Sequence, residues 1–361
     1  MSKLLDYLKG KPLYWLLLAI PVVLLAEFLH WGPIITFVFS ALGVIPLAGL
    51  IGDATEELVH YTGPKVGGLL NATLGNAAEL IITIVAIREG LLELVKASIT
   101  GSILGNLLLV LGMAMLFGGV RNGVQTFDRR QASRNAILLV LTVLILLVPS
   151  LLSHYIGPDN SVRVEALSLG VAAVMIILYA LGLFYSFRSG ENPEAAPEDQ
   201  HGASQNASWS LPKALIVLAV VTVGVAFLSE VLVGAVEPVV QALGISEFFI
   251  GVIFVPIIGN VAEHLVAVQV ALRNRMTLSV EIAVASSLQI ALFVAPVLVF
   301  LSLLLGHPLT LIFNQFELLA LIAGVMIAAL VSEDGESNWL EGAELLAIYI
   351  ILGLAFFLLP V

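Results

Sequence analysis

Charged residues are scarce in this chain. Only 11% of its 361 residues are Asp, Glu, Lys or Arg, whereas soluble domains carry about 25%. Hydrophobic residues make up 60%, and the mean hydropathy is +1.07. Nearly uncharged runs of about 20 residues recur along the whole length, and a helix of that length crosses the hydrocarbon core of a bilayer. The composition excludes a soluble globular domain and predicts a protein embedded in a lipid bilayer.

Cysteine is absent, and histidine is rare, with six residues. The chain therefore has no disulfide, no thiolate metal site and no cysteine nucleophile. Only His264 lies in the core of an apolar segment, which excludes an intramembrane zinc protease with its two histidines and carboxylate. A membrane serine protease is disfavoured as well, because four further histidines lie at segment ends: His30, His60, His154 and His307.

The apolar segments predict eleven transmembrane α-helices. A β-barrel is excluded, because its strands need about 10 residues of alternating polarity and these segments are longer and do not alternate. The first segment lacks a small-x-small cleavage site and continues into others, so we interpret it as a helix rather than a signal peptide. The predicted class is an all-α polytopic membrane protein, with spans near 13–30, 33–54, 67–87, 97–119, 134–153, 162–187, 212–234, 247–272, 278–305, 309–331 and 342–360.

The 15 basic residues predict the orientation. Eleven spans place the termini on opposite sides, and the side with more Lys and Arg is cytoplasmic. One side holds only Arg88, Lys96 and Arg163, and the other holds the remaining 12. We therefore expect a cytoplasmic N-terminus and a C-terminus outside, in the plasma membrane. The net charge of -11 predicts acidic vestibules that attract cations, and no nucleic-acid partner.

Two six-residue strings repeat 184 positions apart. Gly75-Asn76-Ala77-Ala78-Glu79-Leu80 is nearly copied as Gly259-Asn260-Val261-Ala262-Glu263-His264. Without the first helix, each half has five spans, and an odd number inverts the second half relative to the first. Inverted repeats of this kind build secondary transporters with a site at the bilayer midplane. The predicted units are an N-terminal helix in 1–32, a first repeat in 33–188, an acidic cytoplasmic linker in 189–211 and a second repeat in 212–361.

Each repeated string places one carboxylate inside an apolar span. A charge at the centre of a bilayer costs about 2.5–3.5 kcal/mol on insertion scales, so a matched pair, Glu79 and Glu263, indicates a site. Inverted helices that cross at midplane would bring the two carboxylates face to face. Protonation or a bound divalent cation relieves their repulsion. Competition between these two states is sufficient for an exchanger.

The polar neighbours of the two glutamates are oxygen donors. Asn76 and Asn260 precede the glutamates by three residues, on the same helix face. Oxygen ligands without sulfur or clustered imidazoles favour calcium over zinc or copper, with manganese as an alternative. Pro256 predicts a kink that exposes backbone oxygen near Glu263. Further donors on the following spans are Ser98, Ser102, Asn106, Ser286 and Gln289, and for Ser98 and Asn106 helix–helix hydrogen bonding is an equal alternative.

These motifs resemble the cation/calcium exchanger superfamily. The segments Glu79-Leu80-Ile81-Ile82, Glu263-His264 and Ser286-Ser287-Leu288-Gln289-Ile290-Ala291-Leu292 resemble its calcium/proton exchanger branch. The resemblance implies a transporter, not an enzyme, that exchanges cytoplasmic calcium for external protons by alternating access, without a cofactor. It implies central roles for Glu79 and Glu263 in metal binding and proton coupling. The other implied metal-site residues are Asn76, Asn260, Ser102, Ser286 and Gln289.

Several alternatives stay open at this point. A sodium/calcium exchanger is the nearest one, and a cation channel is disfavoured because channels use rings of groups from several subunits. His264 is interpreted either as part of proton handling or as a packing residue. Oligomers are common in this type of fold, which leaves a homo-oligomer open. Gly101 and Gly105 are expected to form a small-xxx-small packing contact.

Acidic residues near the span ends suggest entrances to the site. Glu56 and Glu237 are expected to end the second and seventh spans at corresponding places, with Glu230 nearby. These three glutamates and Asn106 are candidates for lining an ion pathway. The alternative for the glutamates is that they lie at solvated helix ends without a role in transport. The acidic linker is expected to connect the halves, and calcium sensing is the alternative role.

Overall fold

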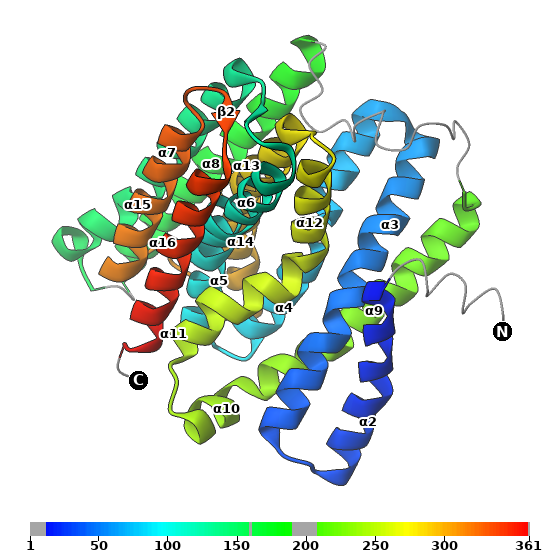
Figure 1. Cartoon of the computed structure of the whole chain (residues 1–361). Coiled ribbons are helices and arrows are strands. Elements are labelled where there is room, and N and C mark those ends of the chain that lie inside the picture. The colour runs from blue at the N-terminus through cyan, green and yellow to red at the C-terminus, as the bar shows by residue number, and fades with distance from the viewer. Residues whose placement is uncertain (1–11, 159–160, 190–207, 360–361) are drawn as a thin grey trace.

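The computed structural model describes residues 12–158, 161–189 and 208–359. These parts are almost entirely helical (Figure 1), as the composition predicts. Eight helical segments are long and apolar enough to cross a membrane, and Leu13–Leu29 and Gln315–Val331 are shorter apolar helices. The eight are Pro33–Thr62, Leu92–Asn122, Arg129–Ile156, Val162–Tyr185, Leu211–Leu243, Glu247–Leu272, Met276–Leu305 and Trp339–Phe357.

The first half of the chain contains five regions of helix after a short N-terminal pair. The pair is a 3₁₀ helix η1 (Pro12–Leu18) that continues into α2 (Ala19–Leu29). The half then runs through α3 (Pro33–Leu74), α4 (Ala77–Arg88), α5 (Leu92–Leu104), the π-helix η2 (Gly105–Val110), α6 (Leu111–Asn122), β1 (Gln125–Thr126), α7 (Arg129–Ile156) and α8 (Val162–Ser189).

The second half resumes with residue 208, so most of the predicted linker lies outside the described residues. Its elements are α9 (Leu211–Gly234), α10 (Val236–Leu243), α11 (Glu247–Phe249), the π-helix η3 (Ile250–Phe254), α12 (Val255–Leu272), α13 (Met276–Gln289), the π-helix η4 (Ile290–Val294), α14 (Ala295–Leu305), α15 (Gln315–Val331), β2 (Glu336–Ser337) and α16 (Trp339–Phe357).

Helix α3 corrects one predicted boundary. The second span was expected to end near residue 54, but the helix continues to Leu74, so Glu56 lies within it and not at its end. The polar residues Thr55 and Thr62 are accommodated because their hydroxyls donate to the carbonyls of Ile51 and Leu58, four residues earlier.

The long helix does not run straight. A methyl group on Gly67 would lie 2.4 Å from Cγ1 of Val59, whereas residues eight apart in a straight helix are separated by about 12 Å. The helix therefore folds back between these two residues, and its last part leads into α4. The predicted third span, 67–87, consists of this returning end of α3 together with α4.

Three π-helical segments interrupt the central spans. The last five residues of η2 lie 184 positions before η4, which is the spacing of the two glutamate motifs. The third segment, η3, ends immediately before α12, where Pro256 is the second residue. The kink predicted at Pro256 stays a prediction; the structure has a π-helix immediately before this proline, a feature that frequently accompanies functional sites.

Glycine allows helix α5 to cross η3 at short distance. A methyl group on Gly101 would lie 2.1 Å from the carbonyl oxygen of Val252, and one on Gly251 would lie 2.8 Å from the carbonyl oxygen of Leu94. Gly101 therefore has the predicted packing role. The prediction is wrong for Gly105, because nothing lies within 4 Å of its missing side chain.

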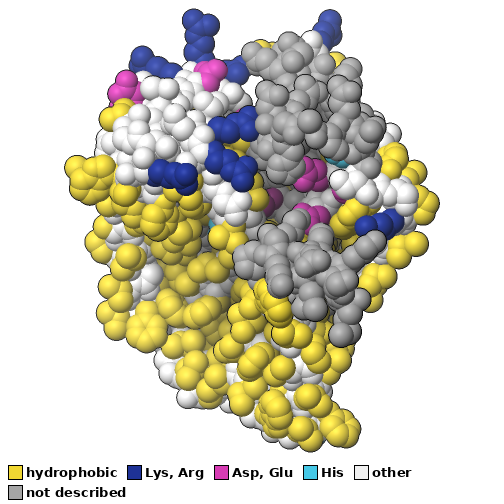
Figure 2. Space-filling model, turned by 45° about the vertical axis from the view of Figure 1, so that its right-hand side comes forward, with side chains coloured by type: hydrophobic (Ala, Val, Ile, Leu, Met, Phe, Trp, Pro, Cys, Tyr) yellow, Lys and Arg dark blue, Asp and Glu magenta, His cyan; other side chains and the backbone are white. Residues whose placement is uncertain are grey.

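Two short strands join distant parts of the chain. β1 and β2 pair antiparallel, with Gln125 opposite Ser337, and they hold the segment after α6 against the segment before α16. The side-chain amide of Gln125 also donates to the carbonyl of Ala271 at 2.9 Å. Figure 2 shows Lys and Arg side chains gathered toward one end of the molecule and a broad hydrophobic surface beyond them.

Replacing Gly101 with alanine should destabilise the protein, because the added methyl group would overlap the backbone of η3. Overpacking of this kind costs about 1–3 kcal/mol. The matched control is Gly105→Ala, four residues later, where the space is open and alanine favours helix. Thermal unfolding in detergent should show a lower midpoint for Gly101→Ala alone. Equal midpoints for the two variants would contradict this account of the crossing.

Candidate ion-binding site

The two repeated motifs meet inside the helical bundle. Glu79 is in the first turn of α4 and is 1% exposed, and Glu263 is partly buried in the middle of α12. A methyl group on Gly259 would lie 3.3 Å from Cβ of Glu79, and one on Gly75 would lie 3.1 Å from Oε1 of Glu263. The glycine of each motif thus lies against the glutamate of the other. Larger residues at these glycines would push the two helices apart.

A break in the helix presents Glu79 to the site. Gly75 still has helical dihedrals, but the chain leaves helical geometry at Asn76 (φ -94°, ψ 14°). The carbonyl of Asn76 accepts the first hydrogen bond of α4, from Leu80 N at 2.9 Å. Glu79 therefore stands beside the N-terminus of α4, where a negative charge interacts favourably with the helix dipole. Glu263 has no such helix end, because α12 is continuous around it.

Residues from both halves hold the Glu79 carboxylate. The hydroxyl of Ser102 on α5 donates to Oε1, and the side-chain amide of Asn260 on α12 donates to Oε2 at 3.1 Å. Charge-assisted hydrogen bonds of this kind are stronger than neutral ones. Both oxygens of Glu79 are thus fixed, one by each half of the chain.

Glu263 is held by one hydroxyl. Ser286 on α13 donates to its Oε2 at 3.2 Å, and Asn106 in η2 donates to the Ser286 hydroxyl at 3.0 Å. Ser102 and Ser286 occupy corresponding positions 184 apart and each contacts the glutamate of its own half. Asn106, predicted as a pathway residue or a helix-packing residue, lies in the site itself.

A further amide pair crosses between the halves. Asn76 donates through Nδ2 to Oε1 of Gln289 at 2.8 Å. The side-chain oxygens of Asn76 and Asn260, and the hydroxyl of Ser98, are buried without a hydrogen-bond partner. Buried polar atoms without partners are rare in proteins, and oxygen is the donor that calcium prefers. These atoms are available to a cation.

The charges of the two glutamates are not balanced by protein. The Glu79 carboxylate lies close enough to that of Glu263 to repel it when both are ionised. Within the described residues, neither carboxylate forms an ion pair, and no three acidic or histidine side chains gather as a metal cluster. A proton or a cation is the remaining means of neutralising them.

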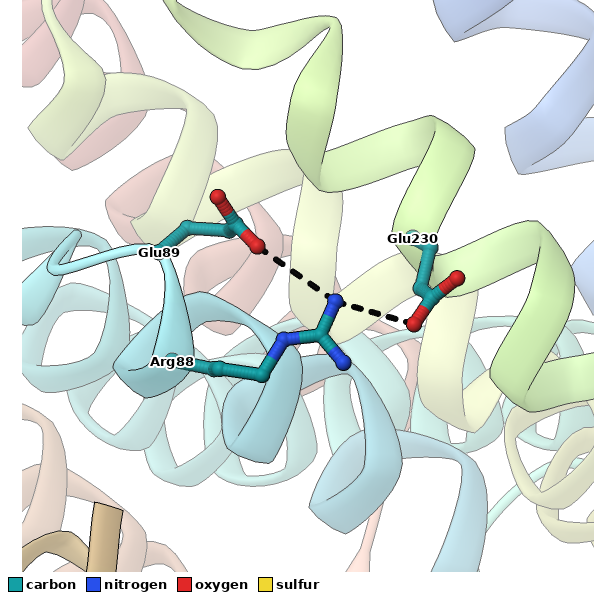
Figure 3. A network of polar contacts seen from close by, with 3 residues as sticks. All are labelled: Arg88, Glu89 and Glu230. Atoms are coloured by element: carbon teal, nitrogen blue, oxygen red, sulfur yellow. Dashed lines mark hydrogen bonds and ion pairs between the residues drawn. The ribbon is translucent and has the colours of Figure 1, made fainter.

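The remaining predicted residues are His264, Glu56, Glu237 and Glu230. His264 is buried in α12, at 4% exposure, next to Glu263 in the chain. Glu56 on α3 and Glu237 on α10 are exposed. Glu230 on α9 forms an ion pair with Arg88 at 2.9 Å (Figure 3) and does not reach the two glutamates.

Glu317 is a buried carboxylate that was not predicted from the sequence. It is 2% exposed and forms a capping box with Asn314 at the start of α15. The amide N–H of Asn314 donates to its Oε2 at 2.7 Å, and the hydroxyl of Thr100 donates to its Oε1 at 3.3 Å. The pattern Asn-x-x-Glu before an apolar run is the signal that could have found this cap. Because its Oε2 accepts from the backbone N–H of the N-cap residue, Glu317 stabilises the start of α15.

Comparison with protein families identifies the chain. The family model described as sodium/calcium exchanger protein matches residues 32–188 and 213–358. The chain belongs to the sodium/calcium exchanger family. The two matched segments of this exchanger coincide within a few residues with the predicted halves, 33–188 and 212–361.

Relatives of this exchanger match nearly its whole length. A Ca(2+)/H(+) antiporter of Aphanothece halophytica is 46% identical over 365 residues and covers 98% of both chains. The Ca(2+)/H(+) antiporter ChaA of Bacillus subtilis is 42% identical over 344 residues, which is 94% of this chain and 97% of that protein.

Solved structures share the fold of this exchanger. The structure of native YfkE superposes with a TM-score of 0.83 at 41% identity and covers 96% of this chain and all of that one. The H+/Ca2+ exchanger CAX superposes with a TM-score of 0.71 over 96% of this chain and 91% of that chain; at 17% identity this likeness concerns the fold alone.

Proposed function

We propose that this protein is a secondary antiporter that exchanges cytoplasmic calcium for protons by alternating access. The observation that carries the proposal is the pair Glu79 and Glu263, which lie together inside the bundle, have no basic partner among the described residues, and accept hydrogen bonds from both halves. Relatives named as Ca(2+)/H(+) antiporters that match almost the full chain support the same activity. The protein is a transporter and not an enzyme.

Competition between calcium and protons for the two carboxylates accounts for the coupling of their transport. Calcium takes six to eight oxygen ligands, and the carboxylates of Glu79 and Glu263 with the unpaired oxygens of Asn76 and Asn260 supply several of them. Ser102, Ser286 and Gln289 complete the proposed set of ligands and supporting groups. When calcium leaves, protons neutralise the carboxylates, so that the site is never empty and doubly charged. Manganese uses the same kind of oxygen donors and is a second candidate cargo.

His264 is proposed to take part in proton handling. It follows Glu263 directly, it is buried, and the first motif has Leu80 at the corresponding place. A titratable group present in only one half makes the two halves chemically different.

The exposed carboxylates are proposed to attract cations to the entrances. Glu56 lies on α3, a helix that packs along α12, and Glu237 lies on the short helix after α9. Both side chains are accessible to solvent. Glu230, the third candidate for the pathway, is engaged by Arg88 in this conformation.

The proposed topology is eleven spans in two inverted halves, in the plasma membrane, with the N-terminus in the cytoplasm. The reciprocal contacts of Gly75 and Gly259 and the 184-residue spacing of η2 and η4 support a two-fold relation between the halves. The gathering of Lys and Arg at one end (Figure 2) supports the orientation.

Flux in sealed vesicles distinguishes proton from sodium coupling. The purified protein, reconstituted without sodium, should accumulate calcium when a pH gradient is imposed, because protons alone can replace calcium at the two carboxylates. The control is the same vesicle with the gradient collapsed by a protonophore. An absolute requirement for sodium would overturn the proposal in favour of a sodium/calcium exchanger.

Glu79→Gln and Glu263→Gln should each abolish this exchange, since an amide neither ionises nor releases a proton. Loss of one charged ligand is expected to weaken calcium binding by about 10- to 100-fold. Glu317→Gln is the matched control, because it changes a buried glutamate outside the site. Proton-driven calcium uptake retained in either site variant would contradict the central role of the pair.

Ser286→Ala should weaken calcium affinity by about 10-fold, because it removes the hydroxyl that orients Glu263 and contacts Asn106. The neighbouring serine provides the control. The Ser287 hydroxyl donates to the carbonyl of Ala283 within its own helix, so Ser287→Ala should change the affinity less than about twofold. Calcium titrations of both variants in detergent measure the two affinities. Equal calcium affinities of Ser286→Ala and Ser287→Ala would contradict a role of Ser286 in the site.

A further inference from the structure

A three-residue ionic network lies where α4 ends. Arg88 contacts Glu230 at 2.9 Å and Glu89 at 3.4 Å (Figure 3). Arg88 and Glu89 are neighbours in the chain, whereas Glu230 comes from α9. Only the contact with Glu230 therefore joins two separate helices.

The two joined helices have different places in the molecule. α4 carries Glu79 in its first turn and Arg88 as its last residue. α9 packs along α3 more extensively than any other two elements pack together, and in Figure 1 these two helices and α2 stand at one side of the bundle. The Arg88–Glu230 pair thus connects the helix that bears the site to the α3–α9 pair.

Buried side chains close the site of the two glutamates at the end that faces Arg88. Between Glu79 and Arg88, the side chains of Ile82, Thr83 and Ile87 are at most 1% exposed. Toward the other end the packing is looser, since Glu263 is partly exposed and Asn71, in the part of α3 that leads to the site, is exposed. The end of the site near Asn71 is therefore more accessible to solvent than the end near Arg88.

We infer that the Arg88–Glu230 pair is a latch that holds α9 against α4 and keeps the site closed at this end. The inference rests on the proposed alternating access, which requires the closed end to open in each cycle. Opening there separates α9 from α4 and breaks the pair. The two side chains are 54% and 49% exposed, and exposed ion pairs are weak, so the latch biases the two conformations by about two- to fivefold.

Thiol labelling measures the latch without reference to transport. The chain has no cysteine of its own, so a single Val85→Cys reporter gives an unambiguous signal. Val85 lies one turn before Arg88 on the same helix face and is 7% exposed. Adding Glu230→Gln should raise the rate of labelling by a membrane-impermeant maleimide about two- to fivefold.

Two further variants show whether a change in labelling rate is due to the Arg88–Glu230 contact. Glu89→Gln is the matched control, because it removes a carboxylate that contacts Arg88 without joining α4 to α9, and it should leave the rate unchanged. The exchanged pair Arg88→Glu with Glu230→Arg should restore the parent rate. If Glu230→Gln labels at the same rate as Glu89→Gln, the latch does not exist.

A reversible cross-link tests the same contact during transport. In Arg88→Cys/Glu230→Cys, a short bifunctional thiol reagent should stop proton-driven calcium uptake in vesicles, and reducing agent should restore it. Each singly substituted protein should transport as fast after treatment with the reagent as before it, so that a loss of uptake in the double variant is due to the bridge. Full uptake by the bridged protein would overturn the inference. Absence of uptake before bridging would instead count against the proposed antiport, while the labelling rates would still decide on the latch.

Discussion

The site depends on two carboxylates that lie together inside the bundle, with no basic residue among the described residues to balance them. Glu79 and Glu263 repel each other when both are ionised, and the described part of the chain supplies hydrogen bonds but no counter-charge. In the proposed mechanism, protons or a cation occupy this site in turn and relieve the repulsion. Calcium and protons then compete for the same carboxylate oxygens, so that their coupled movement requires no separate machinery.

The surrounding fold makes this arrangement sterically feasible. Gly75 and Gly259 let each helix approach the glutamate of the other, and Gly101 lets α5 cross η3 with direct backbone contact. The helix is interrupted at Asn76, and π-helices lie next to Pro256 and close to Ser286, beside the donors of the site. The symmetry is incomplete, however. Both carboxylate oxygens of Glu79 accept hydrogen bonds, whereas only one oxygen of Glu263 does so among the described residues. Glu263 is also more exposed than Glu79.

The sequence predicted those features that follow from local pattern. Composition predicted a helical membrane protein, and the bounds 247–272 agree with Glu247–Leu272 although three different helical elements make up that segment. The repeated strings identified the two glutamates, and the structure brings them together. The hydroxyls of Ser102 and Ser286 donate to these glutamates, and their role in binding a metal stays a prediction.

Features that depend on three-dimensional contacts could not be predicted in this way. The pairing of Asn76 with Gln289 joins residues 213 positions apart, and no local pattern encodes it. Gly101 and Gly105 are alike in sequence, yet only Gly101 faces another backbone. Helix α3 continues past residue 54, with the hydroxyls of Thr55 and Thr62 satisfied within the helix, so that Glu56 does not end a span as predicted.

The number of protons released when calcium binds decides whether the two ions compete for Glu79 and Glu263. Calcium titrations by calorimetry, repeated in buffers with different ionisation enthalpies, give this number from the dependence of the observed heat on the buffer. We expect proton release at a pH where the calcium-free site is protonated, and its loss in Glu79→Gln/Glu263→Gln. Calcium binding with no proton release at any pH would contradict this competition.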